Sequence, residues 1–132
     1  MSAFVKFVDE TPAGDVLREL KLHVAEESLT VRALIERRVR HEVARFNDED
    51  MLRVFNGLVQ PDGAEAHQDG YRLQKARRLD AEQQCSRALS AFERNGFCML
   101  VGDRQVESLD EEIALVADTK IAFIKLVPLV GG

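Results

Sequence analysis

The end of the chain holds the residues best suited to chemistry. Gly131 and Gly132 follow Pro128, Leu129 and Val130. Because glycine has no Cβ, a diglycine end can pass through a narrow channel and leaves its terminal carbonyl unhindered on both faces. A partner enzyme with ATP can adenylate such a carboxylate, and an amine, a thiol or a sulfide can then attack the activated carbonyl. The pattern predicts activation at Gly131 and Gly132, with the three preceding residues as the segment that a partner recognises.

The cysteines and histidines form no recognisable site. Cys85 and Cys98 are too far apart for a CxxC motif, and His23, His41 and His67 lack metal-ligand spacing. Both cysteines are expected to be small core residues, as free cysteines usually are. The chain also contains no nucleophile elbow, phosphate-binding loop or zinc-protease motif. We therefore expect no metal, no cofactor and no enzymatic activity of its own.

Length and composition indicate one globular domain. The 132 residues are 45% hydrophobic and 31% charged, which suits a chain with a substantial core. The net charge of -5 argues against a nucleic-acid partner, because phosphate binding needs a concentrated basic surface. No apolar run reaches the roughly 20 residues of a membrane span, and residues 1–10 do not resemble a signal peptide. We expect no membrane partner and a cytoplasmic location.

The first two strands are predicted to form a hairpin. Residues 3–8 are β-branched and aromatic, and residues 16–24 include a run that alternates between apolar and polar side chains. The segment between them contains Pro12 and Gly14, which favour a turn. Strands this close in sequence pair most simply as an antiparallel hairpin.

Two helices are predicted from apolar residues at helical spacing, over residues 30–46 and 81–94. Asn95-Gly96 is a suitable stop for the second helix. Side chains that can cap the helix N-termini precede or begin both segments. These candidates are Ser28 and Thr30 for the first helix and Asp80 for the second.

The C-terminal part of the chain predicts further strands. Residues 97–101 and 120–127 are apolar strand candidates, residues 105–106 a short return strand, and residues 108–116 a short helical turn. Pro128 cannot donate a ladder hydrogen bond, so the tail behind it is expected to leave the sheet.

The expected fold class is α+β, with one mixed sheet in which the first and last strands lie side by side and parallel. Both alternations of the last strand are apolar, and we favour Ile121 and Phe123 as the inward pair. The full candidate core is Phe4, Val8, Leu20, Leu22, Leu34, Ile35, Val39, Val43, Phe46, Leu89, Phe92, Met99, Leu109, Ile113, Ile121 and Phe123.

The C-terminal part of the sequence resembles ubiquitin. The matching segments are Phe97-Cys98-Met99-Leu100-Val101-Gly102-Asp103-Arg104-Gln105-Val106, Ser108-Leu109-Asp110-Glu111-Glu112-Ile113, Lys120-Ile121-Ala122-Phe123-Ile124-Lys125-Leu126 and Gly131-Gly132. Residues 3–46 resemble the opening hairpin and central helix of that family. The resemblance implies a ubiquitin-like β-grasp, in which a mixed sheet wraps a central helix. It further implies a single domain over 1–127, with an insertion at about 47–96 that carries the second helix, and a flexible tail over 128–132.

The resemblance also implies a function. A ubiquitin-like modifier has its C-terminal carboxylate, here that of Gly132, adenylated by an activating enzyme and transferred to a target amine as an isopeptide bond. A conjugating enzyme, a deconjugating protease and a target protein are the further partners implied. The apolar, proline-containing tail is similar to those of bacterial ubiquitin-like proteins and sulfur carriers. Two alternatives remain: a sulfur carrier with a C-terminal thiocarboxylate, and an interaction module that is not conjugated. The inserted segment favours the modifier, because sulfur carriers are usually minimal β-grasp domains.

Overall fold

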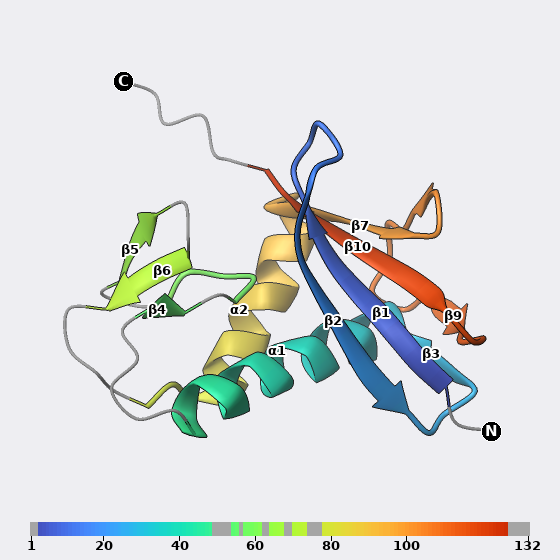
Figure 1. Ribbon diagram of the computed structural model, residues 1–132, viewed down its shortest axis with the longest axis horizontal. Helices are drawn as coiled ribbons and strands as arrows, with labels where there is room; N and C mark the ends of the chain where they lie inside the picture. Colours follow the sequence, from blue (N-terminus) through green and yellow to red (C-terminus); the bar gives the residue numbers. More distant parts are fainter. Residues whose placement is uncertain are drawn as a thin grey trace. The chain divides into compact units, whose positions relative to one another are not determined.

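The computed structural model (Figure 1) describes residues 3–48, 54–55, 57–61, 64–67, 70–73 and 78–126. The chain divides into two compact units. The first comprises Met1–Leu34 and Ala91–Gly132, and the second comprises Ile35–Ser90. Both boundaries fall inside helices, which are α1 (Val31–Asp48) and α2 (Ala81–Glu93).

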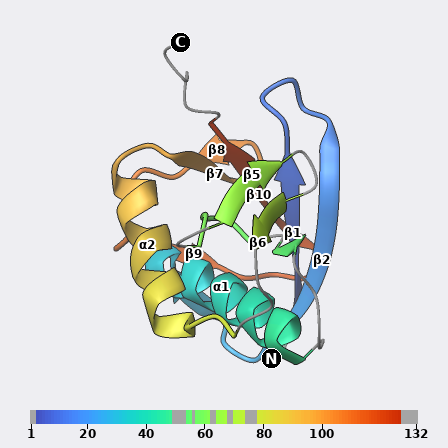
Figure 2. The same ribbon diagram turned by 90° about the vertical axis from the view of Figure 1, so that its left-hand side faces the viewer.

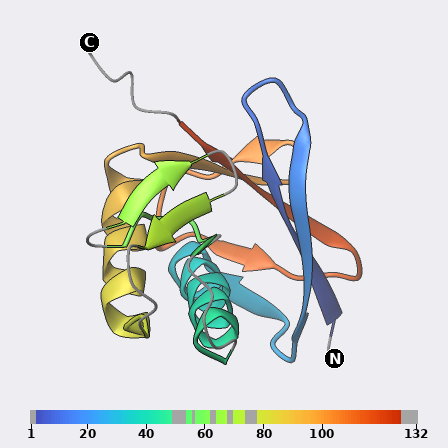
Figure 3. The same ribbon diagram turned by 60° about the vertical axis from the view of Figure 1, so that its left-hand side comes forward.

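The first unit is built on a mixed five-stranded sheet. Its strands, in spatial order, are β2 (Val16–Val24), β1 (Ala3–Glu10), β10 (Thr119–Lys125), β7 (Phe97–Val101) and β8 (Arg104–Gln105). β1 and β2 form the predicted antiparallel hairpin, and β1 runs parallel to β10, as Figure 3 shows. The parallel pairing of the first and last long strands is therefore confirmed, and the fold class is α+β.

One face of this sheet carries its largest buried side chains. Phe7 lies beside Ile121 in the register of β1 and β10, and Met99 lies opposite Phe123 in the register of β10 and β7. All four are at most 2% exposed. The rings of Phe7 and Phe123 stack with centroids 5.8 Å apart. The predicted inward pair, Ile121 and Phe123, is confirmed as buried.

The opposite face carries ion pairs between neighbouring strands. Lys6 Nζ lies 2.9 Å from Glu19 Oε1, and Lys120 Nζ lies 2.9 Å from Glu10 Oε2. Each pair joins two neighbouring strands, since Lys6 and Glu10 belong to β1. Such cross-strand pairs stabilise a sheet modestly, and Val8 and Ala122 are buried on the same face.

The predicted core is confirmed at most positions, and one residue is wrong. Phe4 is 59% exposed, and its ring meets that of His23 edge-on, with centroids 5.3 Å apart. Val8, on the same face of β1, is 1% exposed, so Phe4 is exposed because it lies near the start of the strand; Val5 and Phe7 point to the other face and are at most 2% exposed. Three further candidates, Leu20, Leu22 and Leu89, are half-buried. The confirmed positions are Val8, Leu34, Ile35, Val39, Val43, Phe46, Phe92, Met99, Leu109, Ile113, Ile121 and Phe123.

The helical turn predicted over 108–116 is wrong, because part of this segment forms a second, two-stranded sheet. β3 (Ser28–Thr30) pairs antiparallel with β9 (Glu112–Ala114), and Leu115 N donates to Glu27 O at 2.8 Å. A turn at 109–110 precedes β9. Pairing with β3 engages backbone groups that a helix would need, so the segment becomes a strand. The short return strand lies at Arg104–Gln105, one residue earlier than predicted.

Helix α1 begins directly after β3. Thr30 Oγ1 accepts a hydrogen bond from Ala33 N at 3.1 Å, which confirms one of the two predicted N-caps. Two further N–H groups of the first turn, those of Val31 and Arg32, donate to the carbonyls of Glu111 and Leu109 at 2.9 and 3.0 Å. These contacts satisfy amides that a helix leaves without internal partners.

The second unit contains the remaining parts of both helices and a three-stranded antiparallel sheet. The strand order is β4 (Val54–Phe55), β6 (Gly70–Leu73) and β5 (Ala64–His67). Within this unit α1 and α2 lie side by side, as Figure 2 shows, and Arg40 Nη2 lies 2.7 Å from Glu82 Oε1. At the start of α2, Asp80 Oδ1 accepts from Glu82 N at 2.9 Å and confirms the predicted cap. Within the described ranges, no helix is long and apolar enough to span a membrane.

Candidate functional site at the end of the last strand

The predicted activation residues, Gly131 and Gly132, and the predicted recognition segment of Pro128, Leu129 and Val130 lie outside the described residues. The structure therefore defines the site from its base, where β10 ends. Residue 127, predicted as the last residue of the strand, also lies outside them. The geometry at Lys125 and Leu126 shows how the body of the first unit holds the chain just before the tail.

The end of β10 is held by β7 on one side. In the antiparallel register, Ile124 lies opposite Cys98 and Lys125 lies opposite Phe97. Leu126 is beyond the strand, and its N–H donates to Gly96 O at 3.2 Å. The Leu126 side chain is 39% exposed. The chain is thus tied to the body by its backbone up to Leu126.

The acceptor of that hydrogen bond is positioned by the end of α2. Asn95 adopts a left-handed φ of 61°, its N–H donates to Phe92 O at 3.1 Å, and Gly96 N donates to Ala91 O at 2.7 Å. This pair of bonds is a Schellman motif, which satisfies carbonyls at a helix C-terminus. A Cβ on Gly96 would lie 3.2 Å from Ala91 O, so glycine fits this close approach best. The helix stop predicted at Asn95-Gly96 is confirmed.

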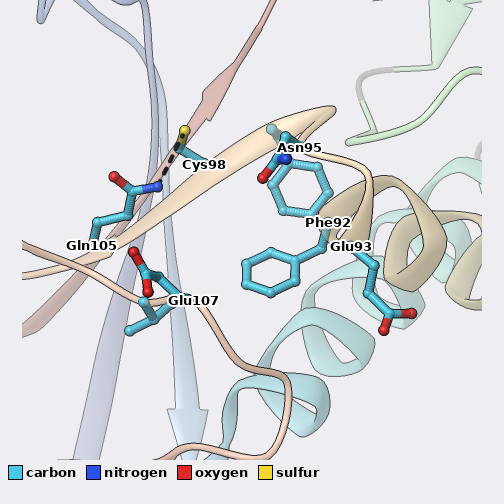
Figure 4. A pocket seen from close by; sticks show the side chains of 8 residues that line it. Phe92, Glu93, Asn95, Cys98, Gln105 and Glu107 are labelled. Carbon is cyan, nitrogen blue, oxygen red and sulfur yellow. Dashed lines mark hydrogen bonds between the residues drawn. The ribbon is translucent and has the colours of Figure 1, made fainter.

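A cavity of about 180 Å³ lies next to this junction, between the last turn of α2 and the strands β7 and β8 (Figure 4). Its apolar part is buried: Phe92, Phe97 and Val106 are each at most 7% exposed. The rings of Phe92 and Phe97 are tilted by 56°, with centroids 5.9 Å apart. Cys98 is half-buried, and its Sγ accepts a hydrogen bond from Gln105 Nε2 at 3.8 Å. The exposed lining residues are Glu93, Asn95, Gln105 and Glu107.

Among its described residues, the lining of this cavity contains no histidine and no cation. A reactive cysteine needs a cation or a histidine that favours its thiolate, and the lining offers Cys98 only carboxylates and amides. In the part of the chain that the structure describes, no group of three or more metal-binding side chains is found. Phe97 and Cys98 contribute both to the cavity and to the ladder that ends β10.

The other cysteine is sequestered. Cys85 is 3% exposed on α2, and its thiol donates to Glu36 O at 3.9 Å within the second unit. Burial is the main reason why the pKa of Cys85 is raised, and it outweighs the opposing effect of Arg40. The prediction that the cysteines are core residues holds for Cys85, whereas Cys98 is only half-buried.

No family model, curated protein or solved structure matches this chain. The functional argument therefore depends on the residues of the chain and on the way β10 ends. The cavity was not predicted from the sequence, because it forms only when the end of α2 packs near β7 and β8. The one local signal for it was the pair of aromatic residues, Phe92 and Phe97, that flank the helix stop at Asn95-Gly96.

Proposed function

We propose that this chain is a ubiquitin-like protein modifier with a β-grasp fold. In this proposal the carboxylate of Gly132 is adenylated by a partner activating enzyme and then transferred to an amine of a target protein. The observation that carries the proposal is the ending of β10. Its ladder stops at Lys125, the Leu126 amide makes the last described backbone contact, and the diglycine follows close behind.

The order of the strands supports the β-grasp. An opening hairpin leads into a helix, and the last strand lies parallel to the first in the middle of a mixed sheet. β10 is therefore the central strand of the sheet, and its pairing with β7 stops at Lys125, from where the chain continues beyond the sheet. A segment of six residues, fully extended, reaches at most about 20 Å. The segment that follows Leu126 is of this length, which is enough to enter the active site of another protein.

The proposed chemistry balances without a catalytic residue from this chain. A carboxylate oxygen of Gly132 attacks the α-phosphorus of ATP, and pyrophosphate leaves. The amine of a target lysine then attacks the acyl carbon, AMP leaves with the electron pair of the broken bond, and the amine loses a proton. The product is an isopeptide bond. Glycine favours both steps because no side chain hinders the carbonyl.

Two other functions share parts of this proposal. A sulfur carrier would undergo the same adenylation but would end as a thiocarboxylate at Gly132. A non-conjugated interaction module would use its body alone. The second unit, with its own three-stranded sheet and an ion pair between its helices, favours the modifier over the carrier, because sulfur carriers are usually minimal β-grasp domains.

An exchange assay tests the activation step. The intact chain is mixed with ATP, labelled pyrophosphate and candidate activating enzymes from its native host. We expect exchange with the intact chain and none with a chain that lacks Gly131 and Gly132. The matched control is Cys98→Ser, which changes one side chain of β7 opposite Ile124 without touching the carboxylate and should exchange normally. Exchange that persists without the diglycine would contradict the proposal.

The mass of the C-terminal peptide separates the modifier from the sulfur carrier. In protein purified from the native host, we expect an isopeptide bond between Gly132 and a lysine. Replacement of one C-terminal oxygen by sulfur would favour the carrier instead. If removal of Gly131 and Gly132 leaves the function in the host unchanged, the interaction module is the remaining explanation.

A further inference from the structure

The outer edge of β2 is a candidate interaction surface. Among the described residues, β2 pairs only with β1, although it runs from Val16 to Val24. An edge strand presents a row of unpaired N–H and C=O groups that can accept a further strand. The other edge of the sheet is β8, which has only two residues. The long free edge of the first unit is therefore β2.

The side chains of β2 that face the core leave apolar surface uncovered at this edge. Leu20 and Leu22 share a face with the buried residues Phe7 and Val5, which are their partners in the register. Both leucines are nevertheless only half-buried. A neighbouring strand on the outer side of β2 would cover the rest of each side chain and so remove apolar area from water.

The other face of β2 carries two exposed charges placed symmetrically about Leu20. Glu19 and Lys21 are both exposed and point to the face opposite the core. If two copies of β2 pair antiparallel with Leu20 opposite Leu20, each Glu19 lies opposite Lys21 of the second copy. The two-fold symmetry creates this pair twice. Opposite charges directly across a ladder are favourable, and like charges are unfavourable.

We propose that β2 pairs with β2 of a second copy of this chain, centred on Leu20, so that the two five-stranded sheets form one continuous sheet. The charges favour this register over its immediate neighbours. A shift that places the axis at Glu19 or at Lys21 puts like charges opposite each other, and a slip of one residue turns the leucines to the wrong face. The contact is isologous and uses the long edge of both copies, so it closes at a dimer.

Glu19 can serve both contacts. Its Oε1 lies 2.9 Å from Lys6 Nζ on β1, and a carboxylate has a second oxygen available for another cation. In the dimer it would lie between Lys6 of its own chain and Lys21 of the second copy. Lys6 is also the register partner of Lys21 within one chain. An acidic residue at position 21 would therefore attract Lys6 within the monomer but repel Glu19 of the second copy in the dimer.

Sedimentation velocity over a range of protein concentrations tests the proposal, with the full chain and three variants. We expect the wild-type chain to dimerise. Lys21→Glu should raise the dimer dissociation constant about tenfold or more, because it replaces two attractive pairs by two repulsive ones. Glu19→Lys should act in the same direction. The double variant Glu19→Lys/Lys21→Glu restores both pairs and should recover most of the dimer.

Thermal unfolding of each variant separates dimerisation from folding. Lys21→Glu places a carboxylate opposite Lys6 within the chain, so its monomer should be at least as stable as that of the wild type. A wild-type chain that remains monomeric at all concentrations would overturn the proposal. So would a dimer that is equally stable in both single variants, since it would use another surface. Failure of the double variant to recover the dimer would exclude the register centred on Leu20.

Discussion

The N–H of Leu126 donates a hydrogen bond to the carbonyl oxygen of Gly96 at 3.2 Å. This bond joins the residue that follows the last strand to the residue that follows the Schellman end of α2. The base of the tail is therefore set by the backbone of two segments that are distant in the sequence. Its geometry depends on the left-handed turn at Asn95, and that dependence can be tested.

Asn95 adopts a left-handed φ of 61°, a conformation that most side chains disfavour. Asn95→Ala should lower the free energy of unfolding by about 1 kcal/mol, because alanine lacks the local hydrogen bonding that helps asparagine to adopt this conformation. Asn95→Gly should be neutral or slightly stabilising, since glycine has no Cβ penalty. Urea unfolding followed by circular dichroism measures both. Equal losses in the two variants would argue against strain at this position.

The N-cap of α2 is a second local determinant of stability. Asp80 Oδ1 accepts hydrogen bonds from Glu82 N at 2.9 Å and Gln83 N at 3.4 Å. Asp80→Ala should cost about 1 kcal/mol of unfolding free energy, while Asp80→Asn should retain most of the cap. Chemical denaturation compares the two. A loss as large in the asparagine variant as in the alanine variant would assign the effect to charge instead.

Two phenylalanines of the sheet offer a matched comparison of burial. Phe123 is fully buried and Phe4 is 59% exposed on the other face. Phe123→Ala should destabilise the protein by about 3–5 kcal/mol, the range for large core truncations, whereas Phe4→Ala should cost below about 1 kcal/mol. The same denaturation experiment reports both values. Comparable losses would mean that Phe4 is buried, contrary to its 59% exposure.

The two cysteines should differ in their reaction with a thiol reagent. In the folded chain Cys98 should react first, because Cys85 is 3% exposed and its burial raises the pKa of the thiol. Cys98→Ser should remove the fast phase, and Cys85→Ser should leave it unchanged. A fast phase that survives in Cys98→Ser would show that Cys85 is accessible.

The raised pKa of Cys85 also predicts how the stability of the protein depends on pH. Because the folded pKa of Cys85 lies above its unfolded value, the stability that the neutral thiol contributes is fully present below the unfolded pKa, which is about 8.5 for a free cysteine. That contribution should be lost as pH rises through the folded pKa. Cys85→Ala should remove this part of the slope when the free energy of unfolding is measured across that range. An unchanged slope would assign the alkaline loss to other groups.

The elements that the sequence predicted best are those whose signals are local. Helical spacing with caps at Thr30 and Asp80 located both helices to within two residues, and Asn95-Gly96 marked the end of α2. The prediction failed where the outcome depends on distant segments. β1 is apolar on both faces, so alternation alone did not exclude Phe4 from the core. The 108–116 segment became β9 because β3 supplied a partner.

The candidate site could be predicted only in part, for the same reason. Gly131 and Gly132 are recognisable in the sequence because their chemistry is local to the chain end. The cavity beside Cys98 could not be predicted, because its walls come from α2, β7 and β8. The Gly96 contact with Leu126 also joins residues far apart in the chain. The activation site itself stays a prediction that requires a chemical test.

Peptide mass spectrometry of modified proteins from the native host tests the central claim most directly. Lys125 is the last basic residue, so trypsin would leave Leu-Val-Pro-Leu-Val-Gly-Gly on the modified lysine. The proposal predicts this remnant on target lysines when the intact chain is expressed, and its loss when Gly131 and Gly132 are deleted. Contradiction would come from a functional chain whose Gly132 carboxylate is always recovered free, with the remnant found on no lysine.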